Sequence, residues 1–202
     1  MQTKTNKRGK RTEQIVLLAI LTAMVSVLAY FGGFIKIGVT ASISLTLIPV
    51  VIGATLCGPF AGAWLGAISG VVFFATPDAA AWFGLNAAGT IITVMVKGIL
   101  AGYCAALVYK WLEKYNRYFA VVVSAIVCPV VNTSVFILGC FVFFKDSIVQ
   151  GAASKDVSIF MFIIVFYIGL NFVFELITNI VVSPAIVRVL DISNKAMGKS
   201  NK

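Results

Sequence analysis

The chain has 202 residues, of which 60% are hydrophobic and 11% charged, and its mean hydropathy is +1.03. A soluble domain of this size needs more polar sequence to cover its surface, so the composition excludes one and predicts an integral membrane protein. The formal net charge of +9 does not indicate nucleic-acid binding, because the basic residues gather at the ends and in one short loop, as they do around membrane spans.

The sequence lacks several residues on which common chemistries depend. There is no histidine, which excludes His-based catalysis and most zinc sites. The four cysteines lie in apolar segments without a CxxC pair, so we interpret them as packing residues and expect neither a metal nor another cofactor. The length leaves no room for a nucleotide-binding module beside the spans, so we expect neither an ATPase nor another enzyme in this chain.

The apolar segments predict an all-α integral membrane protein, a compact bundle of six transmembrane helices in a single domain that covers residues 1–202. A spanning helix needs about 20 apolar residues. The basic run before the first apolar segment resembles a signal peptide, but that segment is long and five more follow, so we expect a retained helix. We place the helices at 13–31, 43–57, 59–75, 85–111, 118–144 and 157–189, between cytoplasmic tails at 1–12 and 191–202.

Glycines in the third segment recur at every fourth position after a Gly58-Pro59 turn. This spacing puts them on one helix face, where another helix can approach closely, as membrane helices often do. We therefore predict tight packing along this face. The glycines are Gly58, Gly62, Gly66 and Gly70.

The distribution of basic residues predicts that both termini are cytoplasmic. With the N-terminus inside, twelve of the 16 Lys and Arg residues fall on the cytoplasmic side and three in outer loops, while Lys97 lies within a span. The outer loops are then 32–42, 76–84 and 145–156. The first of these is rich in glycine and β-branched residues and can be extended. The glycine turn falls on the cytoplasmic side, so we expect those glycines to be scaffolding and not ligand contacts.

Two charged residues lie at membrane depth, Lys97 in the fourth segment and Glu175 in the sixth. A buried charge needs a partner, and two alternatives follow. Either the two side chains form a structural ion pair, or Lys97 meets an anionic ligand while Glu175 orients that ligand or binds a polar group.

Asparagines at similar depth on three helices favour the ligand alternative. Asn86, Asn132 and Asn171 are more than hydrogen bonding between helices requires. They suit a small polar ligand that enters from outside between aromatic walls. Trp82 can instead be an anchor at the membrane interface. The candidate aromatic walls are Trp82, Phe83, Phe136 and Tyr167.

Three local patterns carry a resemblance to a known family. Ala19 to Ala23 (AILTA) forms an AxxxA motif, the segment Pro49 to Gly70 joins two short helices by a Gly-Pro turn, and Pro129 to Thr133 precedes Phe136 and Gly139. Together they resemble the substrate-binding S component of energy-coupling factor (ECF) vitamin transporters, over residues 13–190. The third pattern resembles the fifth helix of pantothenate-type members.

This resemblance implies a function and partners. The chain would capture a water-soluble vitamin, with pantothenate the first candidate and riboflavin, folate, hydroxymethylpyrimidine, cobalamin or another vitamin as open alternatives. Ala19 and Ala23 would dock onto a transmembrane T component that works with two ATPase subunits in the bacterial cytoplasmic membrane. Lys97 would then neutralise a ligand carboxylate, and the three asparagines would bind its remaining polar groups.

A transporter of another class is an alternative reading of the same residues. Glu175 could couple a stand-alone secondary transporter to protons, but such folds often carry inverted repeats and we find no convincing repeat. A membrane enzyme is disfavoured, because the chain has no histidine and no paired carboxylates within a span.

Overall fold

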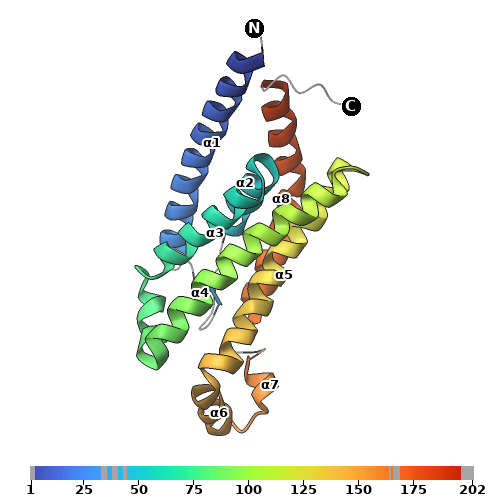
Figure 1. Ribbon diagram of the computed structural model, residues 1–202. Coiled ribbons are helices and arrows are strands. Elements are labelled where there is room, and N and C mark those ends of the chain that lie inside the picture. Colours follow the sequence, from blue (N-terminus) through green and yellow to red (C-terminus); the bar gives the residue numbers. More distant parts are fainter. Residues whose placement is uncertain are drawn as a thin grey trace.

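The computed structural model describes residues 3–32, 36–37, 41–42, 45–163, 165 and 169–196. Within them the chain is a bundle of helices with one short antiparallel strand pair (Figure 1). This architecture confirms the predicted all-α membrane bundle. The elements in chain order are α1 (Thr3–Gly32), β1 (Lys36–Ile37), β2 (Ala41–Ser42), α2 (Leu47–Cys57), α3 (Pro59–Phe73), α4 (Pro77–Leu112), α5 (Arg117–Phe143), α6 (Lys145–Ser154), α7 (Ile159–Phe162) and α8 (Gly169–Ala196).

The helices differ in their ability to cross a membrane. α2 and α3 have 11 and 15 residues and are shorter than the about 20 that a crossing takes. α2 is also the most enclosed helix, since it packs against α1, α3, α4, α5 and α8. Among the described residues, four stretches are long and apolar enough to cross: Thr12–Gly32, Pro77–Leu112, Arg117–Phe143 and Asn171–Val189.

The turn between α2 and α3 follows from two adjacent residues. Gly58 has a φ of 92°, a left-handed conformation that glycine adopts without steric cost. Its N–H donates to the carbonyl of Ala54 and so closes α2. Pro59 then begins α3, where its missing N–H leaves no hydrogen bond unmade.

The glycine face of α3 packs directly against the backbone of α4, which confirms the predicted close approach. A Cβ atom built on Gly66 would overlap the carbonyl oxygen of Gly98, and one built on Gly62 would overlap that of Gly102. Gly98 and Gly102 are themselves four residues apart, so two glycine faces meet. Any larger side chain at these positions would force α3 and α4 apart.

α4 begins at Pro77 and not at residue 85, so the predicted outer loop 76–84 was wrong. Thr76 is extended and Pro77 occupies the first helical turn, a position that proline favours. The helix is interrupted at Asn86, whose φ of −161° and ψ of 102° are not helical. The segment before this break is therefore a separate helical piece that can point in its own direction.

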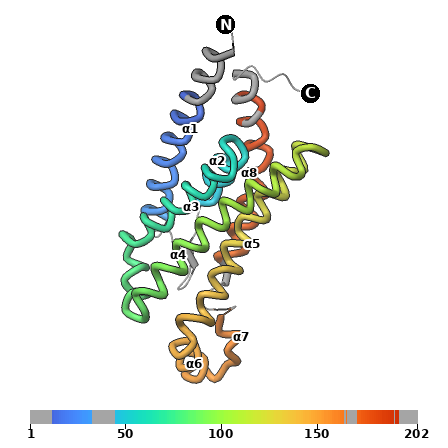
Figure 2. The backbone as a smooth tube through the Cα atoms, viewed as in Figure 1, coloured from blue at the N-terminus to red at the C-terminus, as the bar shows by residue number. Residues whose placement is uncertain are grey.

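Other helix boundaries also differ from the prediction. They lie after the end of α5 and at both ends of the chain. α6 occupies most of the predicted outer loop 145–156, and the predicted sixth helix is divided into α7 and α8. α6 and α7 lie together beyond the end of α5 (Figure 2), because Phe144, Ile148 and Phe162 form a small apolar cluster there. α1 starts at Thr3 inside the predicted tail, and α8 continues to Ala196.

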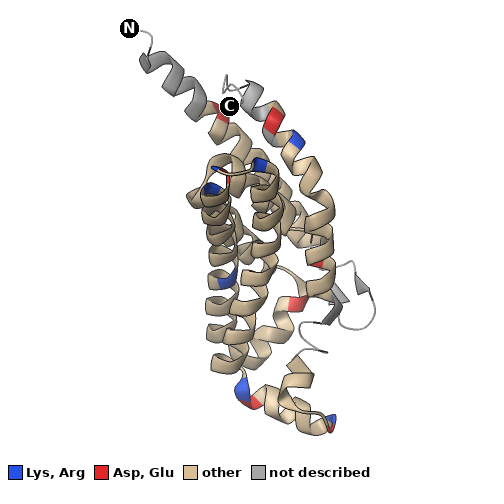
Figure 3. Cartoon of the chain, turned by 90° about the vertical axis from the view of Figure 1, so that its right-hand side faces the viewer, with Lys and Arg blue, Asp and Glu red and all other residues tan. Residues whose placement is uncertain are grey.

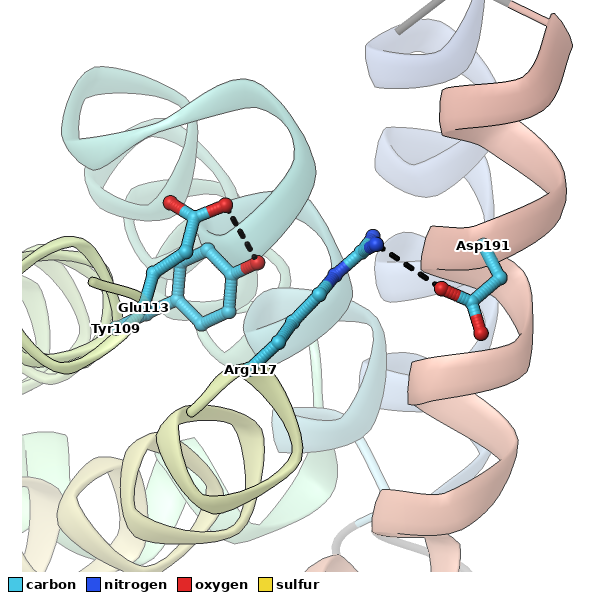
Figure 4. Close-up of polar contacts among 4 residues, drawn as sticks. All are labelled: Tyr109, Glu113, Arg117 and Asp191. Atoms are coloured by element: carbon cyan, nitrogen blue, oxygen red, sulfur yellow. Dashed lines mark hydrogen bonds and ion pairs between the residues drawn. The ribbon is translucent and has the colours of Figure 1, made fainter. Parts of the chain in front are cut away.

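Most of the described charged residues gather near the two ends of the bundle, and a few lie in its middle (Figure 3). At the end where α1 begins, an Arg117 guanidinium N–H donates to Asp191 over 2.9 Å and so connects α5 to α8. Beside it the Tyr109 hydroxyl donates to Glu113 over 3.2 Å (Figure 4). This polar cluster is distant in the fold from the charges that lie in the middle.

Candidate ligand-binding cavity

A cavity of about 160 Å³ lies between α1, α2, α3, α4, α5 and α8. It adjoins the end of α1 and the start of α2, at the end of the bundle opposite the start of α1. An apolar cavity of about 150 Å³ holds a benzene-sized molecule, so this space is large enough for more than water. Its charged and amide-bearing lining residues are Asp78, Lys97, Asn132, Asn171 and Glu175.

The Lys97 ammonium faces two aromatic rings inside the bundle. Its Nζ lies 5.1 Å from the ring centroid of Phe136 and 5.9 Å from that of Phe73. Within about 6 Å, a ring face attracts a cation through its quadrupole. Among the described residues Lys97 makes no hydrogen bond or ion pair, so the direct Lys97–Glu175 ion pair that the sequence allowed is not formed.

A second group of polar side chains at the cavity lies on one face of α8. Glu175 is only 4% exposed and accepts a 3.4 Å hydrogen bond from the Asn171 amide nitrogen. The Asn171 amide oxygen is buried and has no hydrogen-bond partner among the residues that the structure describes. One turn further on, Asn179 donates to the Glu175 backbone carbonyl over 2.8 Å, which occupies its own amide nitrogen.

A buried amide oxygen without a partner is costly and calls for an explanation. Leaving such a group unsatisfied costs about 1–3 kcal/mol. Asn171 also lines the cavity, as does the half-buried Asn132 on α5. The Asn171 oxygen is therefore a ready acceptor for a hydrogen-bond donor placed in the cavity.

The glycine contact between α3 and α4 sets the position of Lys97. Lys97 directly precedes Gly98, which packs against Gly66. One turn along α3, Gly70 lines the cavity together with Phe73. The expectation that these glycines lie away from the cavity holds for the turn at Gly58 but is wrong for Gly70.

Asn86 and Trp82 do not line this cavity. The Asn86 side-chain Oδ1 accepts from the Gly89 N–H over 2.9 Å, and the side-chain amide nitrogen donates to the Phe143 backbone carbonyl over 3.2 Å. The Asn86 side chain thus caps the part of α4 that follows the break, and it connects this part to the end of α5. Trp82 packs edge-on against Phe136 and Phe144, at centroid distances of 5.4 and 5.2 Å.

The remaining predicted aromatic walls have different positions. Phe136 contacts the Lys97 ammonium, as described above, while Phe83 packs against Phe74 at 5.7 Å between centroids. Tyr167 lies outside the described residues. The structure therefore brings four of the predicted site residues to one cavity, Lys97, Asn132, Asn171 and Glu175.

Sequence reasoning missed Asp78 and Phe73 as residues of this cavity. Asp78 lies in the first turn of α4, a stretch predicted as loop, and Phe73 ends α3 beside the glycine face. A carboxylate directly after a Thr-Pro helix start was the available signal for Asp78. For Phe73 the three-residue spacing from Gly70 was the signal, since residues three apart share a helix face.

The fold and the cavity define a class of protein, a multi-pass helical membrane protein that encloses a polar pocket near one end. Residues 13–187 match the family described as ECF transporter, substrate-specific component. The chain belongs to this family of transport subunits. Among curated proteins and among solved structures, nothing matches the chain.

Proposed function

We propose that this chain is the high-affinity capture subunit for one water-soluble vitamin, with pantothenate as the first candidate. The observation that carries the proposal is the cavity in which Lys97, Asn132, Asn171 and Glu175 converge from three helices. Charged and amide groups at membrane depth are expensive, and they are usually retained for a ligand or an ion. Family membership supports a substrate-binding role.

Pantothenate offers chemistry that suits these groups. It carries one carboxylate, an amide and two hydroxyls. In this proposal Lys97 pairs with the carboxylate through a charge-assisted hydrogen bond, which is about twice as strong as a neutral one. Asn132 and Asn171 bind the amide and hydroxyl groups, and Glu175 accepts from a hydroxyl. Asn86 and Trp82 support this binding indirectly, through the break in α4 and the ring contact with Phe136.

The cavity opens to the outside of the bacterial cytoplasmic membrane in this proposal, and both termini are cytoplasmic. α1 begins and α8 ends at the same end of the bundle, opposite the cavity (Figure 1). That end also holds Lys110, Lys114 and Arg117, as the preference for basic residues on the cytoplasmic side requires. Six membrane passages, two of them by the short helices α2 and α3, agree with this orientation.

A T component and two ATPase subunits complete the proposed importer. Ala19 and Ala23 are exposed on α1, while Leu21 and Val25 on its other face are buried against the bundle. A small-residue face of this kind lets a partner helix approach closely. Co-expression with T and ATPase subunits tests the docking. We expect Ala23→Leu to prevent assembly and the matched exposed change Ala88→Leu on α4 to leave it intact.

The direct test is to identify what the protein carries. The chain is purified from cells grown in rich medium, and its bound small molecules are released and identified by mass spectrometry. We expect a vitamin in near-equal amount to the protein, and much less of it in Lys97→Ala. Lys110→Ala, an exposed lysine on the same helix, is the matched control. If purified protein carries and binds no vitamin, the proposal is wrong. Uptake by this chain alone that an uncoupler abolishes would instead favour proton coupling through Glu175.

A further inference from the structure

The turn between α4 and α5 carries an excess of positive charge. It lies toward the end of the bundle where α1 begins (Figure 1). Lys110 in the last turn of α4 and Lys114 just beyond it are exposed, and neither makes an ion pair or hydrogen bond with another described residue. Glu113 is the one carboxylate beside them, and the nearby Arg117 is already paired with an aspartate of α8. The two ammonium groups are therefore available to an anionic partner.

Four large aromatic side chains lie next to these lysines in the chain. Their exposed fractions are between 57% and 81%, so most of their surface lies outside the bundle. Trp and Tyr are favoured at the level of the lipid headgroups, because the ring is apolar while its N–H or O–H is polar. The turn therefore has the composition of a segment at the membrane interface. The four aromatic residues are Trp111, Tyr115, Tyr118 and Phe119.

An apolar stripe leads away from this turn along the outer face of α4. Its members are spaced by three, four and four residues, which places them on one helix face, and each is at least 37% exposed. From its first to its last member the stripe rises about 17 Å, which is close to one half of a hydrocarbon core about 30 Å thick. One acyl chain can therefore lie along the stripe while its headgroup reaches the lysines. The stripe consists of Leu100, Tyr103, Leu107 and Trp111.

We propose that this stripe and the two lysines bind a phospholipid with an anionic headgroup. The acyl chain packs along the stripe, and the ammonium groups of Lys110 and Lys114 bind the headgroup through charge-assisted hydrogen bonds. The stripe alone would accept any lipid, whereas two positive charges favour an anionic lipid over a zwitterionic one. The lysines lie at the end of the bundle away from the cavity, so this inference goes beyond the proposed function and does not depend on it.

Two brominated lipids with the same acyl chains test this preference, phosphatidylglycerol and phosphatidylcholine. Bromine quenches the fluorescence of a tryptophan that it touches, and Trp111 lies on the stripe. The full chain is reconstituted into bilayers that contain one or the other brominated lipid at equal mole fraction. The quenching due to Trp111 is the part that is absent in Trp111→Phe. We expect phosphatidylglycerol to bind about 30-fold more tightly, about fivefold for each lysine, and high salt to reduce this preference.

A double variant assigns the preference to the lysines. Lys110→Gln with Lys114→Gln is expected to bind both lipids equally. The matched control is Lys145→Gln with Lys155→Gln, which removes the same charge from exposed positions beyond the other end of α5 and should keep the preference. Both double variants should unfold in detergent at the wild-type temperature, because all four side chains are exposed. Equal binding of the two lipids by the wild type, or a preference that survives in the first variant, would overturn the inference.

A partner subunit is the alternative occupant of this surface, and co-expression with T and ATPase subunits distinguishes it. If the wild type shows no lipid preference and the variant at Lys110 and Lys114 fails to assemble, the surface belongs to a partner subunit and the inference is overturned. If the purified protein prefers phosphatidylglycerol but binds no vitamin, the proposed function is overturned and this inference stands.

Discussion

The contact between α3 and α4 changes character along its length. Around Gly62 and Gly66 the two backbones touch, and a single added Cβ would overlap a carbonyl of α4. Around Gly70 the nearest atoms to such a Cβ are the Met95 sulfur at 3.2 Å and the Val94 carbonyl oxygen at 3.3 Å, and there the cavity begins. The contact between α3 and α4 is thus tight around Gly62 and Gly66, its closed end, and borders the cavity around Gly70, its open end.

The contrast between the two ends of this contact explains how a small bundle can hold polar groups at membrane depth. Close backbone contact at the closed end fixes α4, so its next side chain, Lys97, is held at the edge of the cavity without any ion pair among the described residues. Packing supplies the rigidity at one end, and the polar groups remain available at the other. We therefore expect substitutions at the closed end to affect stability and those at the open end to affect affinity.

The largest effect is expected from adding one methyl group at the closed end. Gly66→Ala places a Cβ against the backbone of Gly98, which cannot move aside as a side chain can. We expect the free energy of unfolding to fall by about 3 kcal/mol. Thermal unfolding of purified protein, followed by tryptophan fluorescence, measures the change.

Two other glycines are matched controls for this substitution. Nothing lies within 4 Å of a Cβ built on Gly84, so Gly84→Ala should be neutral or stabilise the helix by up to about 1 kcal/mol. Gly70→Ala should have an intermediate effect, because its neighbours include a flexible methionine side chain. If Gly66→Ala is as stable as wild type, the close contact does not hold the two helices in position.

The next largest effect is expected at the open end, and on affinity. Lys97→Met keeps the length of the side chain but removes its charge. We expect the affinity for pantothenate, or for whichever vitamin co-purifies, to fall about 30-fold through loss of a charged hydrogen bond. The stability of the ligand-free protein should change little, because relief of the desolvation cost of a buried ammonium offsets the loss of its attraction to the rings of Phe73 and Phe136. Lys110→Met is the control, and unchanged affinity in Lys97→Met would exclude the proposed role.

These effects also mark how far the sequence could predict the molecule. Apolar segment lengths and the four-residue glycine spacing predicted a tightly packed membrane bundle. They could not say which helix meets the glycine face, although Gly98 and Gly102 repeat the same spacing. Counting 1.5 Å per residue along a helix gave the depth of Lys97 and Glu175 but not the direction in which each side chain points.

The sequence was least informative about the structure at the break in α4. Asn86 was predicted as a ligand contact because it lies at the right depth for one, but its amide groups serve the helix break instead. An asparagine in an apolar segment looks the same in sequence whether it caps a helix or faces a cavity. Because the helical piece before the break was predicted as loop, Asp78 was not considered as a cavity residue.

A smaller effect is expected when two asparagines of α8 are replaced one at a time. Asn171 lines the cavity, whereas Asn179 is 1% exposed, lies one turn beyond Glu175 and does not line it. We expect Asn171→Leu to weaken vitamin binding about tenfold and Asn179→Leu to leave it unchanged, since Asn179 donates only within its own helix. Calorimetry on both variants gives the ratio. Equal losses would mean that the amides act through the shape of α8 and not through the cavity.

The smallest effect is expected at the end of the bundle farthest from the cavity. The Arg117 and Asp191 side chains remain 21% and 33% exposed, so solvent screens their attraction. Within the described part of the chain, two further Arg117 nitrogens are buried without hydrogen-bond partners, a cost that disappears with the side chain. We therefore expect Arg117→Met to change the free energy of unfolding by less than about 1 kcal/mol and to leave vitamin affinity as in wild type. A double-mutant cycle with Asp191→Asn isolates the pair. A coupling energy above about 2 kcal/mol would show that this ion pair, and not the glycine contact alone, holds this end of the bundle together.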